Sequence, residues 1–151
     1  MGIISYFCKR KGENNMEECV GKKIAEIICQ AWNTLDASLL EPILSDDFEY
    51  ISIWVLETMK GKGRYIEYIT GKFKSISNGG KPVVAKVLYQ EVIDKYVIVL
   101  DQCGNTAALE PTIENGKLKS LWMRPIDMTL PAVFTTKKPN FNNKPSKDQQ
   151  Q

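Results

Sequence analysis

The chain of 151 residues contains no histidine. Histidine is the usual general base near neutral pH and the usual partner of a nucleophilic serine or cysteine. Its absence excludes Ser-His and Cys-His catalytic pairs, mixed cysteine–histidine zinc sites and haem ligation by histidine. The adjacent acids Asp46 and Asp47 lack a clustered third ligand, so they indicate a turn rather than a metal site. The sequence predicts neither a metal nor any other cofactor.

Cysteine is scarce and scattered. The four residues Cys8, Cys19, Cys29 and Cys103 show no CxxC spacing. An all-cysteine zinc site is therefore not expected. We interpret the four as reduced thiols in a reducing compartment, which predicts a cytoplasmic protein.

Long apolar runs and strong charge are also missing. No apolar run approaches the roughly 18 residues of a membrane-spanning helix. The net charge is +2, and the basic residues form small clusters such as Lys9–Lys11 rather than a stripe with interleaved aromatics. We expect neither a membrane nor a nucleic acid as partner.

The composition is that of one globular domain. Apolar residues make up 43% of the chain and charged residues 25%, and a chain of this length buries one core. We expect a flexible arm over residues 1–14, a domain over residues 15–130, and a disordered polar tail over residues 131–151.

Local patterns predict three helices ahead of a set of strands. A helix capped at Asn14 or Asn15 carries an apolar stripe that includes Ile24, Ile28 and Trp32. Asp36 is the expected cap of a short helix over residues 37–44. A strand over residues 48–55 follows, with Phe48, Tyr50, Ser52 and Trp54 on one face. After Gly61, a third helix with an apolar stripe that includes Tyr65, Ile69 and Phe73 ends at Asn78.

Four strands are predicted in the second half, over residues 83–92, 96–103, 106–113 and 117–124. Asn115-Gly116 is a strong signal for a tight hairpin between the last two. Pro111, inside the third of these strands, indicates a bulge or an edge there.

This order of elements resembles the nuclear-transport-factor-2-like superfamily, which includes steroid isomerases, scytalone dehydratase and the SnoaL polyketide cyclases. The resemblance covers roughly residues 16–125 and rests on the Ala31–Asp36 and Leu44–Phe48 segments, on Gly61 and on the Asn115-Gly116 hairpin. It implies an α+β fold with N-terminal helices packed in the concave face of one curved, mainly antiparallel sheet. It also implies an enclosed cavity.

The catalytic groups of these enzymes are not found at the matching positions. The resemblance puts Ser52 where steroid isomerases have the aspartate base, Ile28 at their tyrosine, and Ala108 or Leu109 at their buried acid. The cyclases and the dehydratase rely on histidine. Inherited isomerase, cyclase or dehydratase activity is therefore not expected, and whether the chain is an enzyme at all stays open.

The expected function is small-molecule binding in an apolar and aromatic cavity. Strand and helix parity place these residues around it: Ile28, Trp32, Tyr50, Ser52, Trp54, Glu110 and Trp122. Three tryptophans and a tyrosine around one acid would suit a flat apolar ligand that carries a hydrogen-bond donor. The alternative for the tryptophans is plain core packing, and for Glu110 an exposed position beside Pro111.

A second function is association. On the last strand, Lys117, Lys119, Leu121 and Met123 are spaced two residues apart, so all four should point to the same face of the sheet. The two lysines indicate that this face is exposed to solvent. This places both apolar side chains on the outer face of the sheet. The pattern predicts a homodimer formed through that face, and thus a non-enzymatic association module.

Overall fold

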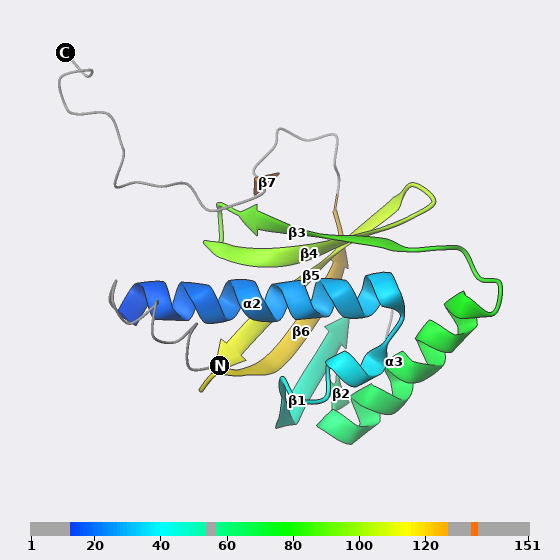
Figure 1. The fold of residues 1–151 in the computed structure, drawn as a ribbon, viewed down its shortest axis with the longest axis horizontal. Helices are drawn as coiled ribbons and strands as arrows, with labels where there is room; N and C mark the ends of the chain where they lie inside the picture. The colour runs from blue at the N-terminus through cyan, green and yellow to red at the C-terminus, as the bar shows by residue number, and fades with distance from the viewer. Residues whose placement is uncertain (1–12, 54–56, 127–133, 136–151) are drawn as a thin grey trace, which may run out of the picture.

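The computed structural model describes residues 13–53, 57–126 and 134–135 (Figure 1). The helices are α2 (Glu13–Thr34), the 3-10 helix η1 (Ala37–Leu39) and α3 (Lys62–Ser77). The strands are β1 (Leu44–Ser52), β2 (Met59–Lys60), β3 (Val84–Gln90), β4 (Lys95–Gln102), β5 (Asn105–Glu114), β6 (Lys117–Pro125) and β7 (Phe134–Thr135). None of the helices described is long and apolar enough to cross a membrane.

The strands form one curved sheet in the order β2-β1-β6-β5-β4-β3-β7. Every pair is antiparallel except β1 with β6, which run parallel. The Asn115-Gly116 turn between β5 and β6 has positive φ at both residues, 53° and 76°, as a two-residue hairpin of this type requires. The predicted mainly antiparallel sheet is confirmed.

Helix α2 crosses the concave face of the sheet, and α3 lies beside β1 and β2 at one end (Figure 1). The apolar stripe predicted for α2 faces the sheet, with Ile24, Ile28 and Trp32 all buried. The stripe of α3 contributes Tyr65, Ile69 and Phe73 to the same core. Helices in the concave face of one sheet are the architecture expected from the sequence.

Several boundaries differ from those predicted. Asp36 caps a helix as expected, since its carboxylate accepts from the Ser38 backbone N–H at 3.0 Å, but that helix is a single 3-10 turn. Strand β1 begins at Leu44, so Asp46 and Asp47 lie within it rather than in a turn. Residues 134–135, assigned to the polar tail, form β7 against β3.

The prediction for the last strand is wrong from Ser120 onward because β6 contains a bulge. Ile113 of β5 pairs with Leu118, whereas its neighbour Thr112 pairs with Ser120. Lys119 is therefore an extra residue in β6, and an extra residue reverses the side-chain alternation beyond it. Leu121 and Met123 consequently face the concave side and are buried in the monomer core.

Asn33 holds α2 against β3 at Ala85, on the edge of the strand that faces away from β4 and beyond the residues that pair with β7. Its side-chain Nδ2 donates to the backbone oxygen of Ala85 at 3.0 Å, and its Oδ1 accepts from the Ala85 N–H at 2.8 Å. The Cys29 thiol donates to the same oxygen at 3.2 Å. The side-chain amide thus completes the backbone hydrogen bonding of a residue whose N–H and C=O point away from β4.

Three tyrosines and a phenylalanine pack where β1 meets α3. The ring centroid of Tyr65 lies 4.7 Å from that of Phe48 and 5.1 Å from that of Tyr50. The ring centroids of Tyr68 and Tyr50 are 5.6 Å apart. Burial raises the pKa of Tyr50 and of Tyr65 well above the ordinary value of tyrosine. Both phenols therefore stay neutral in the folded protein at pH values where an exposed tyrosine begins to ionise.

Asn33→Ala should lower the free energy of unfolding by about 1–3 kcal/mol, because it leaves the N–H of Ala85 without a partner and its C=O with only the weak Cys29 thiol donor at a partly buried edge. Urea unfolding followed by circular dichroism measures the change. Gln30→Ala, an exposed position on the same helix, is the control and should change stability by less than about 0.5 kcal/mol. Equal effects of the two variants would contradict the role assigned to Asn33.

Alkaline pH should unfold the protein through its buried tyrosines. A phenol ionises near pH 10 in the unfolded chain, but the pKa values of Tyr50 and Tyr65 are raised in the folded one. Their contribution to stability is therefore complete below about pH 10 and falls as the pH rises further. Phenolate absorbance and circular dichroism recorded together should show part of the tyrosine titrating only as the fold is lost. Complete titration of all six tyrosines in an intact fold would contradict this.

Candidate functional site

A cavity of about 350 Å³ opens between α2, α3 and the concave face of the sheet; we call it the cone cavity. Its buried wall is formed by Trp32, Tyr50, Ser52, Leu100 and Met123. Its more exposed mouth is formed by Tyr68, Lys72, Val83, Gln102, Asn105, Thr106 and Ala107. The volume is at the lower end of the range of about 300–1,000 Å³ found for ligand pockets.

Three of the predicted pocket residues meet in this wall: Trp32 from α2, and Tyr50 and Ser52 from β1. The alternation read for β1 is correct, because Phe48, Tyr50 and Ser52 are all buried on the concave side. Ile28 is also buried but belongs to the packed core and does not line the cavity. Trp54 lies outside the described residues.

Glu110 and Trp122 do not reach the cone cavity. They pair with each other across β5 and β6 on the opposite face of the sheet, and Trp122 is 43% exposed. The Glu110 carboxylate pairs there with Arg124 at 2.9 Å and with Lys95 at 3.5 Å. The prediction that these two side chains line the pocket is wrong, for Trp122 because of the bulge at Lys119.

Nine of the twelve lining residues were missed by the sequence analysis, among them Tyr68, Lys72, Leu100 and Met123. Tyr68 and Lys72 are four residues apart and thus lie on one face of α3. That face borders the apolar stripe at Ile69 and Phe73, which was visible in the sequence. Met123 could not have been found without knowing the bulge.

The described lining of the cavity offers hydrogen-bond donors and contains no carboxylate. The Tyr50 hydroxyl donates at 3.3 Å to the thioether of Met123, a weak acceptor. The indole N–H of Trp32 is buried and has no acceptor within the described part of the chain. Gln102 is held at the mouth by its bond to the Lys81 carbonyl at 2.8 Å.

This lining suits binding rather than acid–base chemistry. Neither a carboxylate nor a histidine is present among its described residues to take a proton near neutral pH. The raised pKa of Tyr50 makes its phenol a weaker acid than an exposed tyrosine. The wall can hold an apolar body and donate hydrogen bonds to an acceptor.

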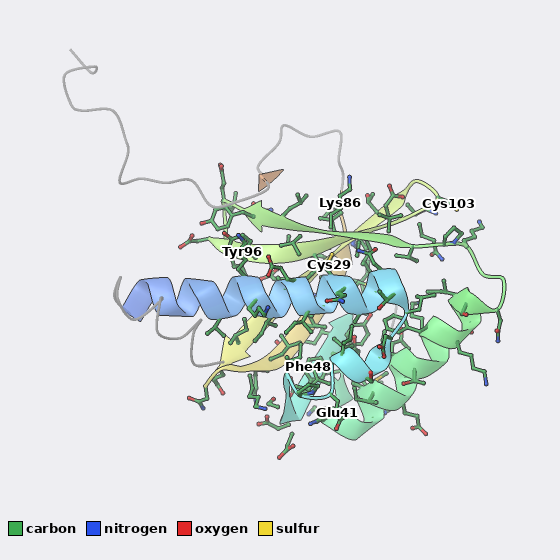
Figure 2. The ribbon with its side chains drawn as sticks, viewed as in Figure 1. Cys29, Glu41, Phe48, Lys86, Tyr96 and Cys103 are labelled. Atoms are coloured by element: carbon green, nitrogen blue, oxygen red, sulfur yellow. The ribbon has the colours of Figure 1, made fainter. Side chains whose placement is uncertain are left out.

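The remaining candidate groups have structural partners. The Asp47 carboxylate forms an ion pair with Lys119, which lowers the pKa of Asp47, and no cluster of three metal-ligating side chains occurs within the described residues. Figure 2 shows Cys29 between α2 and the sheet and Cys103 at the tip of the β4–β5 hairpin. Both are free thiols, and burial raises the pKa of Cys29.

Comparison with known proteins finds similarity at the level of structure. No family model matches the chain, and a search of curated proteins finds no match. A SnoaL-like protein of unknown function from Burkholderia thailandensis superposes with a TM-score of 0.57 at 12% identity, covering 73% of this chain and 97% of that one.

Two further solved structures have a fold similar to that of this chain. An NTF2-like protein of unknown function from Cytophaga hutchinsonii gives a TM-score of 0.52 at 16% identity over 73% of this chain and 93% of its own. A putative ketosteroid isomerase from Kribbella flavida gives a TM-score of 0.53 at 10% identity, covering 84% of this chain and 88% of that one. These TM-scores establish the fold. The chain has the nuclear-transport-factor-2-like fold.

Proposed function

We propose that the chain binds a small, mainly apolar molecule in the cone cavity. The observation that carries the proposal is Trp32, whose side chain lines the cavity and whose indole N–H is buried without an acceptor among the described residues. Buried donors are almost always satisfied by protein, water or ligand. A bound molecule with an oxygen acceptor would satisfy this one once the Trp32 ring turns its N–H toward the cavity.

The lining also changes the ligand chemistry expected from the sequence. A donor-bearing ligand was expected because Glu110 was placed inside the pocket, but Glu110 lies on the other face in an ion-pair network. The polar groups that line the cavity and can donate hydrogen bonds are hydroxyls, amides, an indole and one ammonium. Ligands with acceptor groups therefore suit the cavity better than ligands with donors.

The proposal does not include the reactions named for some proteins of similar structure, a putative ketosteroid isomerase and a putative polyketide cyclase from Sinorhizobium meliloti. Ser52 lines the cavity where the resemblance placed a base, and a serine without histidine is a poor base. Leu109 rather than Ala108 faces the concave side, since it pairs with Met123. Neither position supplies a carboxyl group.

Binding can be tested with 4-phenylbutanamide, a neutral molecule with an aromatic body and an amide acceptor. Isothermal titration calorimetry should show saturable one-to-one binding to the wild type. Ala107→Phe places a ring in the cavity and should weaken binding at least tenfold. Thr112→Phe, on the same strand but on the exposed outer face, is the matched control and should bind as the wild type does.

Failure of the wild type to bind 4-phenylbutanamide at millimolar concentration would contradict the proposed function. So would equal binding by the Ala107→Phe variant, provided that both variants keep the wild-type circular dichroism spectrum.

A second candidate function is self-association through the outer face of the sheet. Leu121 and Met123 cannot form that interface, because both are buried inside the monomer. The outer face instead presents Trp122, which pairs with Ile51 of β1, and nearby Ile53, which is 57% exposed. Exposed large apolar side chains on one sheet face suit burial against a second copy. The neighbouring Glu110 and Arg124 offer both charge signs to such a copy.

If this face forms a dimer, Trp122→Glu should yield monomers, because the carboxylate would be buried against its own copy. Size-exclusion chromatography with light scattering at about 50 μM measures the mass. Val84→Glu, an exposed outer-face position in β3, is the control and should remain dimeric. A monomeric wild type would refute the association function and leave ligand binding untouched.

We also propose that the protein is cytoplasmic. This location is supported by the free thiols of Cys29 and Cys103, the two cysteines whose side chains are described.

A further inference from the structure

Among the described residues, the mouth of the cone cavity carries one cation, Lys72, and no described carboxylate pairs with it. Lys72 is exposed on α3 and lines the mouth. Lys62, Lys95 and Lys119 each lie within 4 Å of a carboxylate, whereas Lys72 forms no such pair with any described residue. On α3 its neighbours three and four residues away are Tyr68, Ile69, Ser75 and Ile76, so the helix surface supplies no counter-charge either.

The interior of the same cavity could not accommodate a charge of its own. Trp32, Leu100 and Met123 form the apolar part of its buried wall, beside the Tyr50 and Ser52 hydroxyls. An anion moved among them would lose most of its hydration without gaining a cation. A charged group is tolerated at the mouth, where Lys72 and the exposed Asn105 lie. Charge and apolar contact are thus separated along the cavity.

We propose that the natural ligand is an amphipathic carboxylate, whose apolar body fills the wall at Trp32, Leu100 and Met123 and whose carboxylate pairs with Lys72 at the mouth. This rests on the proposed function, because it names the class of ligand for the same cavity. The absence of carboxylates from the described lining adds to it, since nothing there repels an anion.

The test compares 4-phenylbutanoate with 4-phenylbutanamide, which have the same shape and differ in charge. At pH 7 and about 20 mM salt, the wild type should bind the carboxylate about fivefold more tightly, the upper part of the range for exposed ion pairs. Raising the salt to about 0.5 M should remove most of that preference, because it shortens the screening length. Isothermal titration calorimetry measures both affinities.

Lys72→Met should make the two molecules bind equally. Lys74→Met removes a lysine of the same helix that is exposed but does not line the cavity, and it should keep the fivefold preference. A shared loss of preference in both variants would mean that general surface charge attracts the anion, and it would overturn the inference.

The outcomes also distinguish failure of this inference from failure of the proposed cavity binding on which it rests. Binding of the amide as tight as or tighter than binding of the carboxylate to the wild type overturns the carboxylate assignment and leaves cavity binding standing. Binding of neither molecule, or binding that Ala107→Phe does not weaken, overturns both.

Discussion

The fold depends on holding α2 against the concave face of the sheet. Apolar burial drives the contact: Ile28, Trp32 and Ala31 of this helix are among its buried side chains, and each buried large side chain contributes roughly 1.5–3 kcal/mol. Burial alone does not fix where along the sheet the helix lies. The two hydrogen bonds between Asn33 and Ala85 do so, because they match a side-chain amide to one backbone position. Trp32, the preceding residue, is thereby set in the cavity wall.

Much of this architecture could be predicted from local patterns. The apolar stripes of α2 and α3, the alternation along β1 and the Asn115-Gly116 hairpin all depend on short-range chemistry, and the structure agrees with each. The role of Asn33 could not be predicted in this way. Its partner Ala85 lies 52 residues further along the chain, and an exposed asparagine near the end of a helix ordinarily indicates nothing more than the end of that helix.

The candidate site was predicted in part, and the errors have one main physical source. Trp32, Tyr50 and Ser52 were found because helix and strand periodicity hold without interruption around them. Because of the bulge at Lys119, Leu121 and Met123 lie on the concave face and Trp122 on the outer face, the reverse of the prediction. Nothing in the residue types of β6 marks that position, since a lysine fits a regular strand as well as a bulge. The ion pair between Lys119 and Asp47 of β1 is visible only once the two strands are side by side.

The central claim is that a ligand enters the cone cavity beside Met123 and Trp32. Methyl-labelled methionine gives a direct measurement, because the chain has five methionines and Met123 is the one that lines the cavity in the described part of the chain. In a ¹³C-methyl NMR titration with 4-phenylbutanoate, the Met123 methyl resonance should shift and show nuclear Overhauser effects to the phenyl protons. The Trp32 indole N–H resonance should move with it. Saturable binding that leaves the Met123 methyl and the Trp32 N–H unchanged would contradict the account.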